Sequence, residues 1–374
     1  MKVIRPVLNF IKKESIFCIA AILAVASCFI VKPTAAYAEY IDFRVLAILL
    51  CLMLVVAVLQ KIGIFEKIMR GITSRIHSAR LLRLVLVLVC FFSSMVITND
   101  VALITFVPFT IMLLNRMDRR GDMIYVVSLQ TIAANLGSMA TPIGNPQNVY
   151  LYSAYNMTMG EFMGTVWLYT LVSLVILCIL SIIPKDARTE TVEVETTSQK
   201  YPVWKYILLV AMFVISILCV LRVVEFWVML IVVLAGTIIW DYKLLAKADY
   251  MLLATFVAFF VLVGNIEQIP QVNNLVGKLI SKDLTIASVA ISQVISNVPA
   301  AVLLSGFTND GASLLAGVNI GGLGTLIASM ASLISYKAYA SEKNSKKGKY
   351  MLVFTGLNIV FLIVMLALFY FVGA

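Results

Sequence analysis

The chain has 374 residues, of which 62% are hydrophobic and only 13% are charged, with a mean hydropathy of +1.01. A globular domain of this composition would have too little polar surface to face water, so the composition excludes a soluble protein. The formal net charge of +10 comes from Lys and Arg residues between apolar runs, where they report membrane orientation and not nucleic-acid binding.

Long apolar runs predict membrane-spanning helices, because lipid cannot satisfy an open backbone and the strands of a barrel would alternate with a period of two. At roughly 20 residues per crossing the chain has room for about ten helices, so we expect an all-α polytopic membrane protein. In chain order the nine expected spans are 15–33, 43–60, 123–157 (broken), 165–184, 205–222, 226–240, 250–266, 312–336 (broken) and 350–372.

Two further apolar stretches have a polar tip: Thr98-Asn99-Asp100 in 84–115 and Ser296-Asn297-Val298-Pro299 in 284–308. The loop charges decide how the first stretch runs, since loops rich in Lys and Arg stay in the cytoplasm. Loop 61–83 carries six basic residues, and three arginines at 116–120 follow the stretch. Both ends therefore lie inside, which predicts a re-entrant helical hairpin.

The same rule orients the rest of the chain in the cytoplasmic membrane. The N-terminus is expected inside, the second hairpin enters from outside, the basic run 337–349 lies inside and the C-terminus ends outside. Basic residues before the apolar run 16–31, followed by Ala36-Tyr37-Ala38, are also typical of a signal peptide. Because further spans follow, we expect an uncleaved first helix.

The polar breaks in the two interrupted spans are variants of one segment. Residues 135–145 and 319–329 align without a gap at an offset of 184 residues, and Asn, Gly, Thr and Ile recur in register. The two copies are expected to cross the membrane in opposite directions, which predicts an inverted-topology repeat with one shared site. The expected organisation is an extra N-terminal helix (1–42), a first repeat (43–184), a cytoplasmic linker with two connecting helices (185–249) and a second repeat (250–374).

Non-helical backbone at membrane depth survives only where protein or a water-filled cavity satisfies it, and the tips and breaks are four such places. Their residue types are typical of helix starts: Thr98, Asn99 or Asp100 before 101–115, Ser296 or Asn297 before Pro299, and Thr141 before Pro142. A helix start presents free N–H groups and about half a positive charge, so such ends bind an anion without Arg or Lys.

We therefore expect the substrate at Asn99, Asp100, Thr141, Pro142, Ser296, Asn297, Val298 and Thr325. Amide, hydroxyl and carbonyl oxygens suit Na+, so the coupling-ion candidates are Thr98, Asn99, Asp100, Asn135, Gly137, Asn145, Asn297, Asn319 and Gly321. Asp100 is a functional candidate because a carboxylate at a hairpin apex is costly in a membrane; it binds a coupling cation or carries a proton. The structural alternatives are a water-facing helix cap for Asp100 and close helix packing for Gly137 and Gly321.

The sequence shows no catalytic constellation, so an enzyme is not expected. The six cysteines are isolated in apolar segments, the single His77 lies in a basic loop, and no P-loop is present. No cofactor is expected beyond Na+ or H+ as the coupling ion. The expected partners are a small anionic substrate and the lipid bilayer, without nucleic acid.

The tips Thr98-Asn99-Asp100 and Ser296-Asn297-Val298, together with the breaks 134–148 and 317–325, resemble those of the ion transporter superfamily. The likeness is strongest to its citrate-transporter-like and arsenite-permease group, related to the divalent anion–sodium symporters. It implies a scaffold domain and a transport domain that moves like an elevator in a homodimer, with Ser-Asn-Thr tips that bind sodium and substrate carboxylates. Here Asp100 and Val298 replace the Thr of those tips, and Leu326 replaces the Pro expected after Thr325.

The leading prediction is a secondary active transporter of a small anion, a carboxylate or an inorganic oxyanion, coupled to Na+ or H+. Two alternatives on the same fold are an arsenite or antimonite efflux permease and a cation/proton antiporter centred on Asp100. A channel or a non-transporting receptor is a third alternative. The inverted repeat argues against it, because that symmetry fits alternating access.

Overall fold

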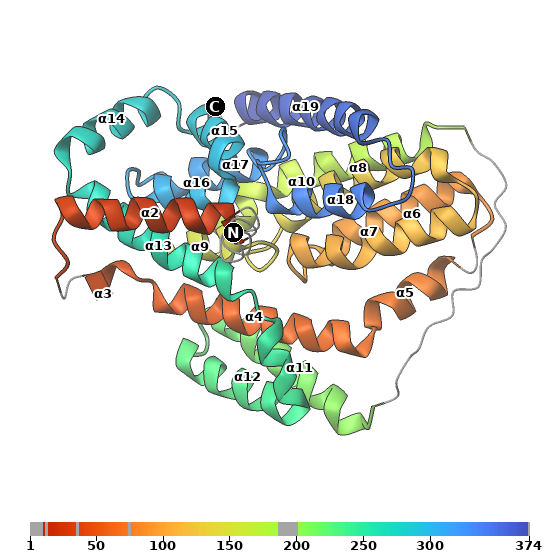
Figure 1. Ribbon diagram of the computed structural model, residues 1–374, viewed down its shortest axis with the longest axis horizontal. Coiled ribbons are helices and arrows are strands. Elements are labelled where there is room, and N and C mark those ends of the chain that lie inside the picture. The colour runs from red at the N-terminus through yellow and green to blue at the C-terminus, as the bar shows by residue number, and fades with distance from the viewer. Residues whose placement is uncertain (1–9, 12–13, 35–36, 74–75, 186–200, 373–374) are drawn as a thin grey trace, which may run out of the picture.

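The computed structural model of the chain describes residues 10–11, 14–34, 37–73, 76–185 and 201–372, and every regular element in them is helical (Figure 1). The helices up to the chain's middle are α2 (Ser15–Ile30), α3 (Tyr37–Tyr40), α4 (Phe43–Ile62), α5 (Ile64–Thr73), α6 (Ala79–Ser93), α7 (Asn99–Arg116), α8 (Arg120–Ser138), α9 (Pro146–Ala154) and α10 (Met159–Ile182). Those that follow are α11 (Val203–Val220), α12 (Phe226–Asp241), the 3-10 helix η1 (Tyr242–Lys247), α13 (Tyr250–Glu267), α14 (Pro270–Ile280), α15 (Leu284–Ile295), α16 (Asn297–Ser305), α17 (Gly311–Ile320), α18 (Met330–Ala340) and α19 (Lys347–Val372).

Aspartate caps explain where four of these helices begin. The side chains of Asp42, Asp249, Asp283 and Asp310 each accept a backbone N–H from the first turn of α4, α13, α15 and α17. Such a cap satisfies one of the N–H groups that a helix start leaves without a partner. Asp42 and Asp249 open the first span of the first and of the second predicted repeat.

Among the described residues, six helical segments are long and apolar enough to cross a membrane: α4, α10, α11, α12 with η1, α13 and α19. The other three predicted spans are α2, with 16 residues, and the two broken segments, each of which is divided between two helices. The prediction of an all-α polytopic membrane protein is confirmed. The total of nine spans stays a prediction.

The predicted loop at 61–83 is wrong as a loop, because it contains the short helix α5, and the connection between α13 and the second hairpin contains another short helix, α14. Both are amphipathic, and Phe65 and Met69 form the buried side of α5. α5 packs against α4 and α7, whereas α14 packs against α13 and α15. Each amphipathic helix therefore joins the first span of a half to the hairpin that follows it.

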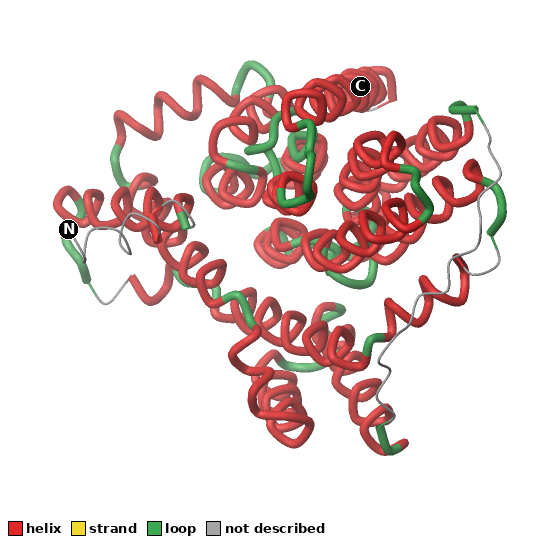
Figure 2. The backbone as a smooth tube through the Cα atoms, turned by 45° about the vertical axis from the view of Figure 1, so that its right-hand side comes forward, coloured by secondary structure: helices red, strands yellow, loops and turns green. Residues whose placement is uncertain are grey.

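The hairpins and broken helices of the two halves pack together in one body. α6 and α7 lie on α8, as α15 and α16 lie on α17. The halves interlock because α18 packs against α7 and α8, while α16 packs against α9. The connecting helices α11 and α12 pack instead on α4 at the lower edge of Figure 1, and α2 packs along α13. Figure 2 shows from another side that the helices at the lower edge lie apart from the body of hairpins and broken helices.

Arg83 is a buried residue of α6, so its placement in the predicted basic loop 61–83 is wrong. Its side chain is 1% exposed and donates to the carbonyls of Pro184 at 2.7 Å and of Ser181 and Lys185 at 3.3 Å. Its guanidinium also lies 3.4 Å from the carboxylate of Asp122. These carbonyls belong to the last turn of α10 and to the residues just after it, where a helix end leaves carbonyls without helical partners, so Arg83 attaches the end of α10 to α6.

We expect Arg83→Met to lower the free energy of unfolding by about 3 kcal/mol, because three carbonyls at the end of α10 lose a charged donor. Arg83→Lys keeps the charge without the planar fork and is expected to recover less than half of that loss. Chemical unfolding of the purified protein in detergent measures both. Wild-type stability of Arg83→Met would show that these hydrogen bonds do not hold α10 in place.

Candidate functional site

Each predicted broken span consists of two helices with a turn between them. α8 ends at Ser138 and α9 begins at Pro146, whereas α17 ends at Ile320 and α18 begins at Met330. The offset of 184 residues that aligns the two sequences maps Pro146 onto Met330, so both helices restart at equivalent positions. The second break is complete although Leu326 stands where the first has a Pro.

The prediction that Thr141-Pro142 begins a helix is wrong. α9 begins at Pro146, because the side-chain oxygen of Asn145 accepts the N–H of Asn148 at 3.1 Å and Pro146 occupies a first position that needs no donor. Thr141 instead donates its hydroxyl to the carbonyl of Met95 at 2.5 Å. Thr141 therefore joins the first break to the first hairpin.

Each hairpin tip is tied to the break of its own half by the same backbone hydrogen bond. The N–H of Asn99 donates to the carbonyl of Gly144 at 3.0 Å, and the N–H of Asn297 donates to that of Ala328 at 3.0 Å. Gly144 and Ala328 are equivalent at the offset of 184 residues, and Asn99 and Asn297 are the first residues of α7 and α16. The symmetry of the sequence thus recurs in the hydrogen bonds.

Gly137 and Gly321 allow the hairpins to pack closely on the broken helices. A Cβ atom on Gly137 would lie 2.2 Å from the carbonyl oxygen of Phe91 and 2.7 Å from Oγ of Ser94. A Cβ atom on Gly321 would lie 2.6 Å from Oγ of Ser292. Both glycines therefore have a steric role, and their role as coupling-ion ligands stays a prediction.

Asn135 connects the first hairpin to the second break. Its side-chain oxygen accepts hydrogen bonds from Nδ2 of Asn99 at 3.1 Å and from Oγ of Ser329 at 3.0 Å. Its own amide nitrogen donates to the carbonyl of Gly322 at 3.4 Å. The side chain of Asn297 lies against Gly322, because a Cβ atom there would be 2.8 Å from its Nδ2. The two tips therefore meet through Asn135 and Gly322.

Asn319, the equivalent of Asn135, makes the reciprocal connection to the first break. Its Oδ1 accepts from Nδ2 of Asn145 at 3.3 Å, and its Nδ2 donates to Oδ1 of Asn148 at 2.8 Å. Asn145 and Ser329 are equivalent, so each buried Asn contacts the helix cap of the opposite half. The predicted coupling-ion residues Asn99, Asn135, Asn145 and Asn319 are thus brought together in one buried network.

One amide side chain satisfies the carbonyls of each break. Nδ2 of Asn148 lies 3.1–3.4 Å from the carbonyl oxygens of residues 138, 139 and 141. In the second half this task falls to Gln293 of α15, whose Nε2 donates to the carbonyls of Gly321 at 2.9 Å and Leu323 at 3.0 Å. Its Oε1 accepts the N–H of Thr325 at 2.9 Å. Gln293 was not among the predicted residues.

The predicted site residues differ in exposure. Asn99, Asn135, Pro142, Asn145, Ser296, Asn297, Val298 and Asn319 are buried, Thr98, Asp100 and Thr141 are half-buried, and Thr325 is exposed. The backbone N–H of Asp100 donates to Oδ1 of Asn99 at 2.9 Å. Among the described residues no hydrogen bond or ion pair to the Asp100 carboxylate is found. The Asp100 carboxylate is therefore chemically able to bind a cation or a proton, and that role stays a prediction.

The two tips differ in backbone strain. Ser296 has φ 76° and ψ 154°, a region that side-chain-bearing residues rarely adopt, whereas Thr98 has φ −62° and ψ 150°. Its hydroxyl lies 3.5 Å from the carbonyl of Ala328, which is a weak hydrogen bond. The second hairpin therefore reaches its break only with a strained residue at the tip.

We expect Ser296→Gly to raise the free energy of unfolding by about 1 kcal/mol, because Gly adopts this conformation without steric cost. Thr98→Gly is the matched control at the unstrained tip, and we expect it to lower stability by about 0.5–1 kcal/mol. Thermal unfolding of both purified variants measures the difference. Equal destabilisation by the two substitutions would contradict strain at Ser296.

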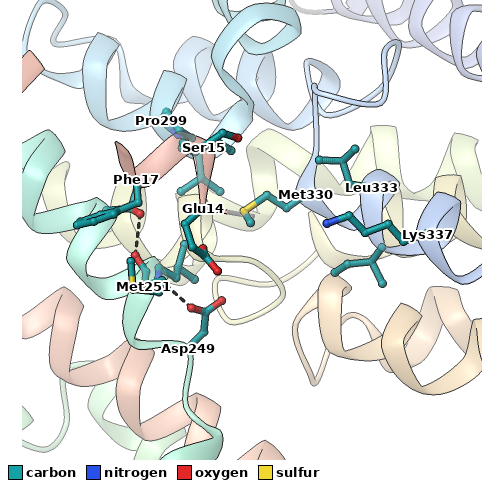
Figure 3. Close-up of a pocket in the computed structure, with 14 residues that line it drawn as sticks. Glu14, Ser15, Phe17, Asp249, Met251, Pro299, Met330, Leu333 and Lys337 are labelled. Carbon is teal, nitrogen blue, oxygen red and sulfur yellow. Dashed lines mark hydrogen bonds between the residues drawn. The ribbon is translucent and has the colours of Figure 1, made fainter. Parts of the chain in front are cut away.

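A cavity of about 110 Å³ lies beside the second tip. Val298 and Pro299 of α16 and Met330 of α18 form one part of its wall. Figure 3 shows Glu14, Asp249 and Lys337 at the same cavity, from the start of α2, the start of α13 and the end of α18. Charged side chains therefore line the same small cavity as Val298 and Pro299, the residues that follow Asn297.

The fold and the site together define the class of protein. Two halves of a polytopic membrane chain each contribute a hairpin tip and a broken helix to a buried polar crossing. This arrangement is typical of membrane transporters whose repeats build one site from discontinuous helices.

Comparison with known proteins agrees with that class. Residues 7–310 match the family described as citrate transporter, and the chain belongs to this family. It is 32% identical to an uncharacterized transporter of Methanocaldococcus jannaschii over 90% of this chain and 92% of that protein, and 28% identical to inner membrane protein YbiR of Escherichia coli over 89% and 90%. It is also 31% identical to silicon efflux transporter LSI3 of Oryza sativa subsp. japonica, over 33% of this chain and 24% of LSI3. The predicted resemblance is confirmed.

Proposed function

We propose that this membrane transporter is a secondary active carrier that moves a small anion, a carboxylate or an inorganic oxyanion, across the cytoplasmic membrane with Na+ or H+. The observation that carries the proposal is the doubled tip-to-break hydrogen bond of Asn99 and Asn297. It places the starts of α7 and α16 at breaks that the network around Asn135 joins. The partial positive charge of two helix starts favours an anion at the tips without Arg or Lys.

Within this proposal the substrate lies at the tips, at Asn99, Ser296 and Asn297, and the coupling ion lies at the crossing of the broken helices. Oxygens of Asn135 and Asn319 are the principal candidates for Na+ there. Asp100 is the candidate for a proton, because its carboxylate sits directly after Asn99. We further propose that the N-terminus lies in the cytoplasm and the C-terminus outside, and that the cavity beside Val298 is the path to the cytoplasm.

An elevator-like motion in a homodimer is the proposed mechanism. The packing supports it, because the hairpins and broken helices form one body while α11 and α12 pack on α4. The short helices α5 and α14 join the first spans to the hairpins, so they are suited to connect a fixed part to a moving one. A dimer would be formed by the fixed part.

Asp100 favours a second candidate, the efflux of an uncharged hydroxylated acid such as arsenite, antimonite or their analogues in exchange for a cation or proton. A carboxylate beside the anion site repels an anion and accepts hydrogen bonds from hydroxyl groups. The similarity to a silicon efflux transporter over part of the chain is consistent with such a solute.

We expect Asn99→Ala and Asn297→Ala each to abolish uptake while the protein remains inserted. A thermal-shift screen of the purified protein against carboxylates, phosphate, sulfate and arsenite, with and without Na+, first identifies the ligand, since binding raises stability by mass action. Uptake of that ligand into proteoliposomes then tests the variants. Asn358→Ala is the control, because Asn358 is buried in α19 and its side chain, among the described residues, bonds only within its own helix. Normal uptake by both tip variants would refute the site.

Asp100→Asn separates the two candidates. In the anion carrier it is expected to change the pH or sodium dependence of uptake while the same anion is still carried. In the efflux permease it is expected to abolish transport of arsenite. An unchanged dependence on pH and sodium would leave Asp100 only a structural place in the first turn of α7.

A further inference from the structure

A basic pocket of about 300 Å³ lies away from the proposed site, where the start of α8 meets the connection between α18 and α19. Its cationic side chains are Arg120, Lys343, Lys346 and Lys349, and Glu342 is its one carboxylate. α8 begins here at Arg120 without a side-chain cap, and α19 begins here at Lys347. Two helix starts and four cations thus surround one pocket, which favours an anion.

The pocket has a fixed inner wall. The hydroxyl of Tyr339 accepts the backbone N–H of Lys346 at 2.9 Å, and the Tyr339 ring stacks on Tyr350 with 4.9 Å between centroids. Tyr350 is fully buried. This holds the connection that carries the lysines against the helical body. A general excess of cytoplasmic charge explains basic residues here, but it does not explain a shaped pocket.

An apolar groove continues from the basic pocket along α7 and α18. Pro108, Ile111 and Met112 line it, and the groove and the pocket share Asn115 and Glu342. Its volume is about 490 Å³. A free anion uses only the basic pocket, whereas a phospholipid uses both, with its headgroup among the cations and an acyl chain on the apolar wall.

Asn115 stands at the junction of the two spaces. Its side-chain oxygen is buried and has no hydrogen-bond partner among the residues that the structure describes. An acceptor of this kind is satisfied by a hydroxyl group. A headgroup with both a phosphate and hydroxyl groups therefore fits the junction and the cations together.

We propose that this pocket and groove bind an anionic phospholipid with a hydroxylated headgroup, between the end of α7 and the α18–α19 connection. Basic pockets between membrane helices on the cytoplasmic side are suited to such headgroups. The lipid bridges the two halves of the chain and stabilises the body that contains the hairpins. This inference does not depend on which substrate is carried.

The test compares lipid binding by the full-length protein and two triple variants. One variant is Arg120→Gln, Lys346→Gln and Lys349→Gln; the control, Lys247→Gln, Lys278→Gln and Lys282→Gln, removes the same charge from exposed lysines elsewhere. The protein is titrated with phosphatidylglycerol in phosphatidylcholine micelles, and the thermal midpoint is followed. We expect apparent affinity to fall about tenfold or more in the pocket variant and less than about twofold in the control.

Inorganic phosphate and glycerol phosphate distinguish the sources of the anion. We expect neither to raise the thermal midpoint at concentrations at which phosphatidylglycerol does. An effect of glycerol phosphate equal to that of the lipid would overturn the lipid assignment in favour of a soluble anion. Equal losses in both triple variants would reduce the effect to general surface charge. If the pocket variant fails to fold, Lys349→Gln alone, with an expected loss of about threefold, replaces it.

Discussion

Asn319→Leu is expected to reduce transport by more than about 100-fold and to lower the free energy of unfolding by about 2–4 kcal/mol. The Asn319 amide donates to Oδ1 of Asn148 and to the carbonyl of Leu315, both at 2.8 Å, and accepts from Asn145 at 3.3 Å. Asn145 is 1% exposed and Asn148 is fully buried. Leu fills a similar volume but leaves both amides short of a partner, and each such loss costs about 1–3 kcal/mol.

The effect on transport exceeds the effect on stability because Asn319 connects the two breaks. Asn148 and Asn145 hold the first break, through the carbonyls of residues 138, 139 and 141 and the cap of α9. A displaced Asn145 or Asn148 therefore changes the backbone to which the tip residue Asn99 is bonded through Gly144. Geometry at such a site is demanding, since displacements of about 1 Å cost about 100-fold in function.

Asn358→Leu is the matched control for this substitution. Asn358 is also fully buried, but its amide donates only to Phe354 of its own helix, at 2.9 Å, and its side-chain oxygen has no partner among the described residues. Leu there removes an unsatisfied polar atom, so we expect stability to be unchanged or higher. Thermal unfolding and proteoliposome uptake compare the two. A loss in Asn358→Leu equal to that in Asn319→Leu would show that any buried Asn matters, and not the network.

The repeat in the sequence predicted much of this site. Residues 135–145 and 319–329 align at one offset, and the structure restarts α9 and α18 at positions related by that same offset. The group of Asn residues was also predicted. Their partners were not, because Asn135 contacts Ser329 and Asn319 contacts Asn145 only where the two broken helices cross. A crossing of that kind depends on tertiary packing.

Local signals failed where two of them compete. Thr141-Pro142 and Asn145-Pro146 both have the pattern of a helix start, and the second is the one used, because Asn145 reaches the N–H of Asn148.

Arg83 was assigned to a loop because a charge count does not distinguish a solvated side chain from one buried against carbonyls. The helix α5 was missed because a ten-residue amphipathic segment with Lys and Arg resembles a basic loop.

Gln293 had one signal in the sequence, an amide inside the apolar stretch 284–295. When the two hairpin tips are aligned at Asn99 and Asn297, Met95 is the equivalent of Gln293. Because the first half has no amide at this position, the repeat did not draw attention to Gln293. The equivalence holds in the structure. The hydroxyls of Thr141 and Thr325 donate to the backbone carbonyls of Met95 and Gln293. In the first half Asn148 bonds the carbonyls of the break, but the equivalent residue in the second half is Ser332. The second break is therefore held by a side chain of the hairpin, Gln293.

Gln293→Met is expected to weaken binding of the transported ligand by roughly 10- to 100-fold. The substitution copies the residue of the first hairpin and removes the hydrogen bonds to Gly321, Leu323 and Thr325. At about 1 kcal/mol each, these bonds amount to about 3 kcal/mol of support for the second break. Gln293→Glu keeps an acceptor for the N–H of Thr325 but loses both donors, so an equal or larger loss is expected.

Met95→Gln is the matched control, because the carbonyls of the first break already have Asn148 as their donor. We expect it to change ligand affinity less than about threefold. Titration of the ligand found in the thermal-shift screen, followed by the thermal midpoint, compares the two substitutions. If Gln293→Met binds the ligand as the wild type does, the second break needs no support from the hairpin. A loss of ligand affinity in Gln293→Met but not in Met95→Gln would show that different side chains hold the backbones of the two breaks. Each side could then be altered separately, the first through Asn148 and the second through Gln293.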